Sequence, residues 1–423
     1  MLSFAGLAIR MIKYNTFTLA NGLRFVVHHD PTTPIVAMNI LYDVGARDEQ
    51  PDKTGFAHLF EHLMFGGSIN ISRYDEPLQV AGGENNAFTN SDYTNYYLTL
   101  PKQNIETAFW LESDRMLSLA FSPKSLEVQR QVVVEEFRQN YLNQPYGDVW
   151  LLLKPLAYKA HPYQWNTIGK DIAHIESATL DDVKEFYSRF YNPNNAIVAV
   201  AGDVTPDEVR ALAEKWFAPI PAGPLRLRNL PTEPQQTEKR FLEVFRAVPA
   251  HAIYKVWHMC AKNDPDYETT DLISDLLGSG QSSPLFKELV LKKGLFAEIS
   301  AFVTGDIDPG LLVVSGKVMD GVPFEKAEKA LSEQLQLFLQ KPPSANELRK
   351  VKNRVVSGQV FSDISVLHKA MNLAFYTHMG DTELINTMTK RYRKVTAAQI
   401  HSVVNQLMTE TNCSTLHYRK END

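Results

Sequence analysis

Hydrophobic and polar positions near the start of the chain follow a pattern that is typical of β-strands. Residues 14–19 and 23–28 flank Asn21-Gly22, a dipeptide that accepts positive φ at both central positions of a tight turn, so we expect a β-hairpin. The apolar run at 35–42 predicts another strand, and after a polar loop at 45–53 the apolar positions take helical spacing. Further helical patterns occupy 102–119, 123–143, 181–190 and 206–217, with a strand predicted at 196–201.

A proline-rich stretch interrupts this pattern near the middle of the chain. Prolines recur between positions 219 and 234 and polar residues follow, so residues 221–237 are expected to form an extended linker. Strand-like runs then return at 241–245 and 253–259, and helical patterns at 264–277, 324–339 and 345–361. The repetition predicts an α+β fold of two similar halves, residues 1–220 and 238–423, each a mostly antiparallel sheet packed with helices.

The first helix after the polar loop contains the sequence H-x-x-E-H, formed by His58, Glu61 and His62. Residues four apart lie on one face of a helix, so both histidines can bind one metal ion while Glu61 lies beside it. Such a match arises by chance in roughly a few per cent of chains of this length. Its neighbours Leu59 and Phe60 are apolar, and burying three polar groups among them without a partner is costly. This setting favours a metal site over a structural polar cluster.

A catalytic zinc ion usually has three protein ligands and one open position, so a third ligand is needed. The apolar segment 132–134 leads into Glu135 and Glu136, in a stretch with a helical pattern. The two glutamates point about 100° apart on a helix, so only one is expected to face the metal. The spacing alone does not choose between them. Zn²⁺ held in this way would activate water for attack on a peptide carbonyl, with Glu61 as general base rather than ligand.

Charge and composition narrow the range of partners. The 423 residues include 43 Lys and Arg and 49 Asp and Glu, a net charge of −6, and no long basic run appears, which argues against nucleic acid as the main partner. No apolar stretch has the length of a membrane span. The weakly apolar start lacks a basic leader, and translation beginning at Met11 is an alternative to Met1. We expect a cytoplasmic protein, with the periplasm as the alternative.

The chain resembles the pitrilysin and insulin-degrading-enzyme family of zinc metallopeptidases, and within it the short bacterial members and the mitochondrial processing peptidase subunits. Five segments carry the resemblance over nearly the whole chain: 58–65, 82–89, 130–136, 191–196 and 278–286. The resemblance implies His58, His62 and Glu136 as the zinc ligands and Glu61 as the base. It also implies a sheet edge beside the metal, to which an extended peptide substrate would add as a strand, formed by Asn86, Ala87, Phe88 and Thr89.

Two departures from the family pattern bear on this interpretation. The family usually has an acidic residue seven positions before the ligand glutamate, whereas this chain has Gln129. Active members also carry an arginine and, seven residues later, a tyrosine that stabilise the oxyanion, and the matching positions here are Val290 and Ala297. Because neither side chain can donate a hydrogen bond, we expect this chain to be the metal-bearing subunit of a heterodimer with a homologous chain that supplies the arginine and tyrosine. Otherwise we expect a homodimer.

Two other functions compete with a zinc endopeptidase acting on peptides or unfolded segments. One is a non-catalytic assembly or scaffold subunit, but such subunits tend to lose the metal-binding residues that this chain keeps. The other is a zinc protein that captures peptides with slow turnover. If the two halves are related, Thr270, Ile273 and Ser274 occupy the positions of His58, Glu61 and His62, so the second half is expected to have no metal site.

Overall fold

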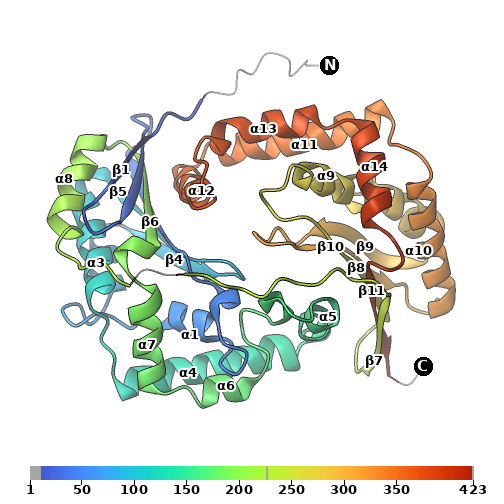
Figure 1. The fold of residues 1–423 in the computed structure, drawn as a ribbon, viewed down its shortest axis with the longest axis horizontal. Helices are drawn as coiled ribbons and strands as arrows, with labels where there is room; N and C mark the ends of the chain where they lie inside the picture. Colours follow the sequence, from blue (N-terminus) through green and yellow to red (C-terminus); the bar gives the residue numbers. More distant parts are fainter. Residues whose placement is uncertain (1–10, 225–226, 422–423) are drawn as a thin grey trace. The chain divides into compact units, whose positions relative to one another are not determined.

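The computed structural model describes residues 11–224 and 227–421, which form two compact units. The described residues of the first unit are 11–135, 167–224, 227–229 and 357–388. The second takes 136–166, 230–356 and the residues from 389 onward. Each unit has one mixed sheet packed with helices (Figure 1), so the predicted α+β class with two sheet-and-helix halves is confirmed. The division of the sequence at 221–237 stays a prediction.

The first unit contains a six-stranded sheet in the order β1-β2-β6-β3-β5-β4. The predicted hairpin is confirmed, since Asn15 pairs with Val27 and Thr18 with Arg24 across the Asn21-Gly22 turn. Only β2 and β6 run parallel, and the other neighbours are antiparallel. The strands are β1 (Asn15–Thr18), β2 (Arg24–His29), β3 (Ile35–Tyr42), β4 (Glu84–Thr89), β5 (Thr94–Pro101) and β6 (Ala196–Gly202).

Helices cover the first sheet on both faces, which explains why every residue of β6 is buried. One of them, α12, lies more than a hundred residues beyond the proline-rich segment 221–237 and packs Ala370, Leu373 and Ala374 into the core beside β3 and β6. The helices with most of their length in this unit are α1 (Phe56–Leu63), α2 (Asp75–Val80), α3 (Ile105–Leu117), α4 (Pro123–Phe137), α6 (Ile172–Glu176), α7 (Leu180–Phe190), α8 (Pro206–Trp216) and α12 (Val366–His378). Short 3₁₀ turns are η2 (Ala46–Asp48), η3 (Lys102–Asn104) and η6 (Pro193–Asn195).

The second unit contains a five-stranded sheet in the order β7-β11-β8-β10-β9, and its one parallel pair is β7 with β11. The strands are β7 (Arg240–Arg246), β8 (Ala252–His258), β9 (Phe296–Val303), β10 (Leu311–Val318) and β11 (Cys413–Lys420). The helices are α5 (Val149–Ala157), α9 (Tyr267–Gly278), α10 (Phe324–Leu339), α11 (Ala345–Ser362), α13 (Leu384–Lys394) and α14 (Ala397–Leu407), of which α11 and α13 cross the unit boundary. The remaining turns are η4 (Arg138–Leu142), η5 (Pro162–Gln164) and η7 (Phe286–Lys292).

The two sheets repeat one topology. In each, a parallel pair (β2 and β6, or β7 and β11) is continued by three antiparallel strands, and a helix follows the central strand, α1 after β3 and α9 after β8. This repeat agrees with two similar halves. In α9 the residues Thr270, Ile273 and Ser274 are all buried, so the helix at this place serves as core. Over residues 11–224 and 227–421, no helix combines the length and apolar character that crossing a membrane requires.

Candidate metal centre

Helix α1 presents its H-x-x-E-H residues on the side that its apolar core does not cover. Phe56, Leu59 and Phe60 are buried, and the Phe60 ring lies 4.5 Å from the Tyr191 ring and 5.4 Å from the Phe186 ring, measured between centroids. These contacts fix the rotation of the helix about its axis. His58, Glu61 and His62 therefore lie on a half-buried face that can bind a ligand and still reach solvent.

The two histidines lie one helical turn apart and face a common point. Their ring centroids are 4.9 Å apart with an angle of 85° between the planes. Helix α4 brings Glu136 to the same place, and one ligand atom from each of the three residues lies within 4.8 Å of the others. Glu136 is half-buried and Glu135 is exposed, because Val133, Val134 and Phe137 turn the apolar face of α4 inward. The boundary between the units falls after Glu135, but α4 is continuous through it.

The donor atoms suit a transition-metal cation. Two imidazole nitrogens and one carboxylate oxygen form a ligand set that zinc takes in catalytic sites, where a fourth position stays open. All three side chains are half-buried, so solvent or a substrate can approach them. Among the residues that the structure describes, His58, His62 and Glu136 form the only cluster of three or more such side chains with this geometry.

Glu61 lies beside this ligand cluster without being part of it. Its Oε2 accepts a hydrogen bond of 2.7 Å from the Thr89 hydroxyl, at the end of strand β4. Strand β4 is the edge strand of its sheet and contacts α1, so Asn86, Ala87, Phe88 and Thr89 form a sheet edge beside the H-x-x-E-H helix. No pattern in the sequence predicts the bond from Thr89 to Glu61.

Two buried tyrosines lie near Glu61. The hydroxyl oxygens of Tyr96 and Tyr191 are 3.5 Å apart. Burial is the largest cause that raises the pKa of both phenols, and the negative charge of Glu61 raises them further. Both hydroxyls therefore stay protonated at neutral pH, and neither competes with Glu61 as a base.

Comparison with known proteins identifies the family. A model described as "Insulinase (Peptidase family M16)" matches residues 24–169, and one described as "Peptidase M16 inactive domain" matches 177–355. The chain is 30% identical over 416 residues to the zinc protease PqqE of Helicobacter pylori, covering 96% of this chain and 92% of that protein. The chain belongs to peptidase family M16. The resemblance seen in the sequence is confirmed.

Further comparisons concern a solved structure and a relative that matches half of the chain. The crystal structure of a protease from Helicobacter pylori superposes with a TM-score of 0.91 at 29% identity, covering 97% of this chain and all of that one. A probable mitochondrial-processing peptidase subunit beta of Schizosaccharomyces pombe is 30% identical over 208 residues, 48% of this chain and 45% of that protein. The match whose description lacks the word "inactive" covers residues 24–169 and includes both histidines.

The structure shows the elements that contain the residues departing from the M16 pattern. Gln129 lies in α4, two turns before Glu136, and is half-buried. Val290 is half-buried in the π-helical turn η7, and Ala297 is exposed on the edge strand β9. The adjacent Phe296 is fully buried, so it is a core residue of the second unit. None of these three side chains at 290, 296 and 297 carries a hydrogen-bond donor.

Proposed function

We propose that this M16 protein is a zinc-dependent endopeptidase that hydrolyses peptides or unfolded segments. In this proposal His58, His62 and Glu136 hold the zinc ion and Glu61 is the general base. The observation that supports it most is the approach of the three donor atoms to within 4.8 Å of one another, with Glu61 on the same helix face. The similarity to a protein named a zinc protease agrees with it.

Glu61 would carry the proton transfers of the reaction. A zinc ion bound at this site would supply Lewis-acid chemistry that polarises water and the peptide carbonyl. Glu61 accepts a proton from the attacking water and later delivers it to the leaving amine, so no net proton is gained or lost by the protein. The Thr89 hydroxyl holds the Glu61 carboxylate in one orientation through its 2.7 Å bond. A carboxylate that is already oriented loses less conformational entropy when it reaches the geometry needed for proton transfer.

The substrate would bind along the edge of the first sheet. Within residues 11–224 and 227–421, strand β4 pairs with β5 and with no other strand, so an extended peptide can add as a further strand next to Asn86, Ala87, Phe88 and Thr89. Backbone hydrogen bonds supply most of the affinity in this mode of binding, and they do not depend on the side chains of the peptide. The protein is therefore expected to accept many sequences, provided that the substrate is unfolded.

Full activity would require a second, homologous chain. Val290 and Ala297 stand where active relatives are expected to have an arginine and a tyrosine, and neither can stabilise an oxyanion. We propose that a partner chain supplies this pair in a heterodimer. Peptidase activity that rises when such a partner is added supports the proposal, and full activity of the purified chain alone contradicts it.

Substitution of Glu61 tests the endopeptidase directly. The Glu61→Gln variant is expected to bind one zinc ion per chain and to lose hydrolysis of an unfolded protein substrate, because glutamine cannot accept and return the proton. The matched control is Glu135→Gln, the same change at an exposed position of α4. Hydrolysis that survives Glu61→Gln, measured with the partner present, rules out this mechanism.

A non-catalytic scaffold role is the second candidate, and the missing oxyanion donors at Val290 and Ala297 favour it. It predicts a zinc protein that hydrolyses no peptide with any homologous partner. Zinc content and turnover measured on the same preparation separate the two functions.

A further inference from the structure

The N-terminal end of α1 is capped by a side chain that lies several residues before its N-cap position. Its N-cap position is Gly55, which has a left-handed backbone (φ 89°) and no side chain to accept a hydrogen bond. The carboxylate of Glu49 takes this role: Gly55 N–H donates to Oε2 at 2.9 Å and Ala57 N–H donates to Oε1 at 2.8 Å. Glu49 is only 7% exposed, and its negative charge also suits the positive end of the helix dipole. Ala57 directly precedes His58, so this cap lies next to the metal ligands.

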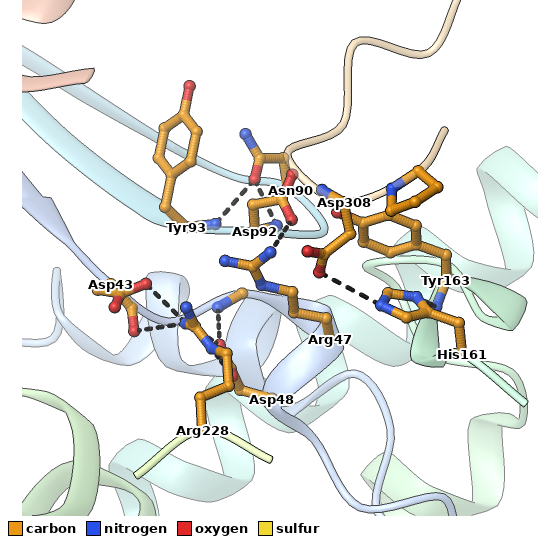
Figure 2. A network of polar contacts seen from close by, with 12 residues as sticks. Asp43, Arg47, Asp48, Asn90, Asp92, Tyr93, His161, Tyr163, Arg228 and Asp308 are labelled. Atoms are coloured by element: carbon orange, nitrogen blue, oxygen red, sulfur yellow. Dashed lines mark hydrogen bonds and ion pairs between the residues drawn. The ribbon is translucent and has the colours of Figure 1, made fainter. Parts of the chain in front are cut away.

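Arg228 of the linker holds the loop that delivers Glu49. This loop, residues 43–49, is here called the capping loop. Arg228 Nε lies 3.0 Å from Asp48 Oδ1, and its Nη2 lies 3.1 Å from Asp48 Oδ2 and 2.6 Å from Asp43 Oδ1 (Figure 2). Burial alone would lower the pKa of Arg228, but Asp48 and Asp43 raise it above its ordinary value, so the guanidinium stays charged. Since Asp48 directly precedes Glu49, the bidentate contact fixes the backbone from which the cap extends.

The other side of the capping loop is joined to the turn between β4 and β5. Arg47 and Asp92 form a buried ion pair of 2.9 Å (Figure 2), and Ala46 N–H donates to the carbonyl of Asn90 at 3.1 Å. Gly45 is required here, because a Cβ atom at this position would lie 2.6 Å from the Asp92 backbone. The capping loop is thus bound both to the linker and to the strand pair that includes the proposed substrate edge.

We propose that Glu49 and Arg228 are positioning residues for the metal centre, which orient the first turn of α1 and through it the histidines and Glu61. This inference rests on the proposed function for its consequence, and on the hydrogen bonds above for its geometry. Arg228 lies 166 residues beyond His62 in the sequence, so a residue of the linker would influence the metal affinity of α1. Supporting residues around metal ligands typically change affinity by about 10–100-fold when they are lost.

Loss of these contacts is not expected to unfold the first unit. The same end of α1 has a second support, in which Thr54 N–H donates to His174 Nδ1 at 3.2 Å and Lys170 N–H donates to the Thr54 hydroxyl oxygen at 2.9 Å. The apolar side of α1 also stays buried against Tyr191 and Phe186. The expected effect is greater mobility of the helix start, with the core intact.

The test compares zinc affinity and local amide exchange in the full chain. Arg228→Gln and Glu49→Gln are each expected to weaken Zn²⁺ binding by about tenfold, measured by competition with a chromophoric chelator. Both should speed hydrogen–deuterium exchange of the α1 amides in the zinc-free chain. Arg228→Lys, which keeps the charge but loses the bidentate geometry, should fall between wild type and Arg228→Gln. The control is Lys239→Gln, which removes a cation two residues beyond the linker from an exposed 3.0 Å pair with Glu410 and should change neither quantity.

The double variant Arg228→Gln/Glu49→Gln should bind zinc about as weakly as either single variant, since both residues act through one loop. Affinity within about twofold of wild type in both single variants, with unchanged exchange of α1, overturns the inference. If the wild-type chain binds no zinc, the proposed function fails, and the exchange measurement on the zinc-free chain still decides whether Glu49 and Arg228 order the helix.

Discussion

Buried His378 on α12 should make the first unit sensitive to mild acid. Its side chain is 8% exposed and its Nε2 lies 3.6 Å from Asp43 Oδ1. Burial lowers the pKa of His378 to about 4, from an ordinary value of 6.5. Asp43 opposes this shift, while Arg47, Arg228 and Arg24 add to it through like charge. The folded protein therefore holds the imidazole neutral at pH values where the unfolded chain binds a proton.

The sign and size of the effect follow from proton linkage. The pKa of His378 is lower in the folded state than in the unfolded chain. The stability that the neutral imidazole contributes is therefore fully present above pH 6.5 and is lost as the pH falls toward 4. Each pKa unit corresponds to about 1.4 kcal/mol, so the loss between pH 7 and pH 4.5 is about 2.5 kcal/mol. In His378→Gln this part of the pH dependence should disappear.

Urea unfolding of the zinc-free chain at pH 7 and pH 4.5, followed for wild type and His378→Gln, measures the difference. His29→Gln is the matched control, because His29 is 41% exposed and its pair with Asp203 spans 3.4 Å. Equal losses of stability in wild type and His378→Gln over this pH range would refute the reasoning.

Three further predictions concern the site and its support. Thr89→Val removes the hydroxyl that donates to Glu61 and should lower kcat/KM by about tenfold or more with zinc content unchanged, while Thr89→Ser should retain activity, as steady-state kinetics can show. Phe60→Ala removes a fully buried ring and should lower the free energy of unfolding by about 3–5 kcal/mol in urea titrations, whereas exposed Phe361→Ala should have little effect. Gly45→Ala should destabilise the capping loop because its Cβ would meet the Asp92 backbone, so a melting temperature equal to wild type contradicts the close approach.

Local sequence signals predicted the elements that depend on local interactions. The Asn21-Gly22 dipeptide specifies the hairpin, and the apolar run at 35–42 becomes β3 with the same limits. The predicted helix at 123–143 is α-helical only to Phe137 and continues as a π-helical turn to Leu142, a change of hydrogen-bond register that side-chain periodicity does not encode. Strand β4 was expected only from the family resemblance, because its polar sequence has little strand character.

Long-range packing could not be read from the sequence. An amphipathic pattern shows that a helix buries one face, but it does not show which sheet covers that face. Neither helix α12 nor its place beside β3 and β6 is among the sequence predictions. Likewise, α5 packs Val149, Leu153 and Ala157 into the core of the second unit although it precedes the predicted linker. Glu49 looks like an ordinary acid in a polar loop, and only the fold shows that its carboxylate caps α1.

The choice between Glu135 and Glu136 as the third ligand also depends on packing that spacing in the sequence does not encode. The residues are adjacent and chemically identical, so spacing from His62 leaves both open, and only the family resemblance implies Glu136. The burial of Val133, Val134 and Phe137 decides the rotation of α4, and Glu136 then lies with the histidines while Glu135 is exposed.

The location of bound zinc tests the proposed metal centre most directly. Crystals grown with zinc, with diffraction data collected on both sides of the zinc absorption edge, would reveal each bound ion by its anomalous signal. A single strong peak within bonding distance of His58, His62 and Glu136 is the predicted result. A peak at other residues only, or none at this cluster when zinc is in excess, would contradict the proposal.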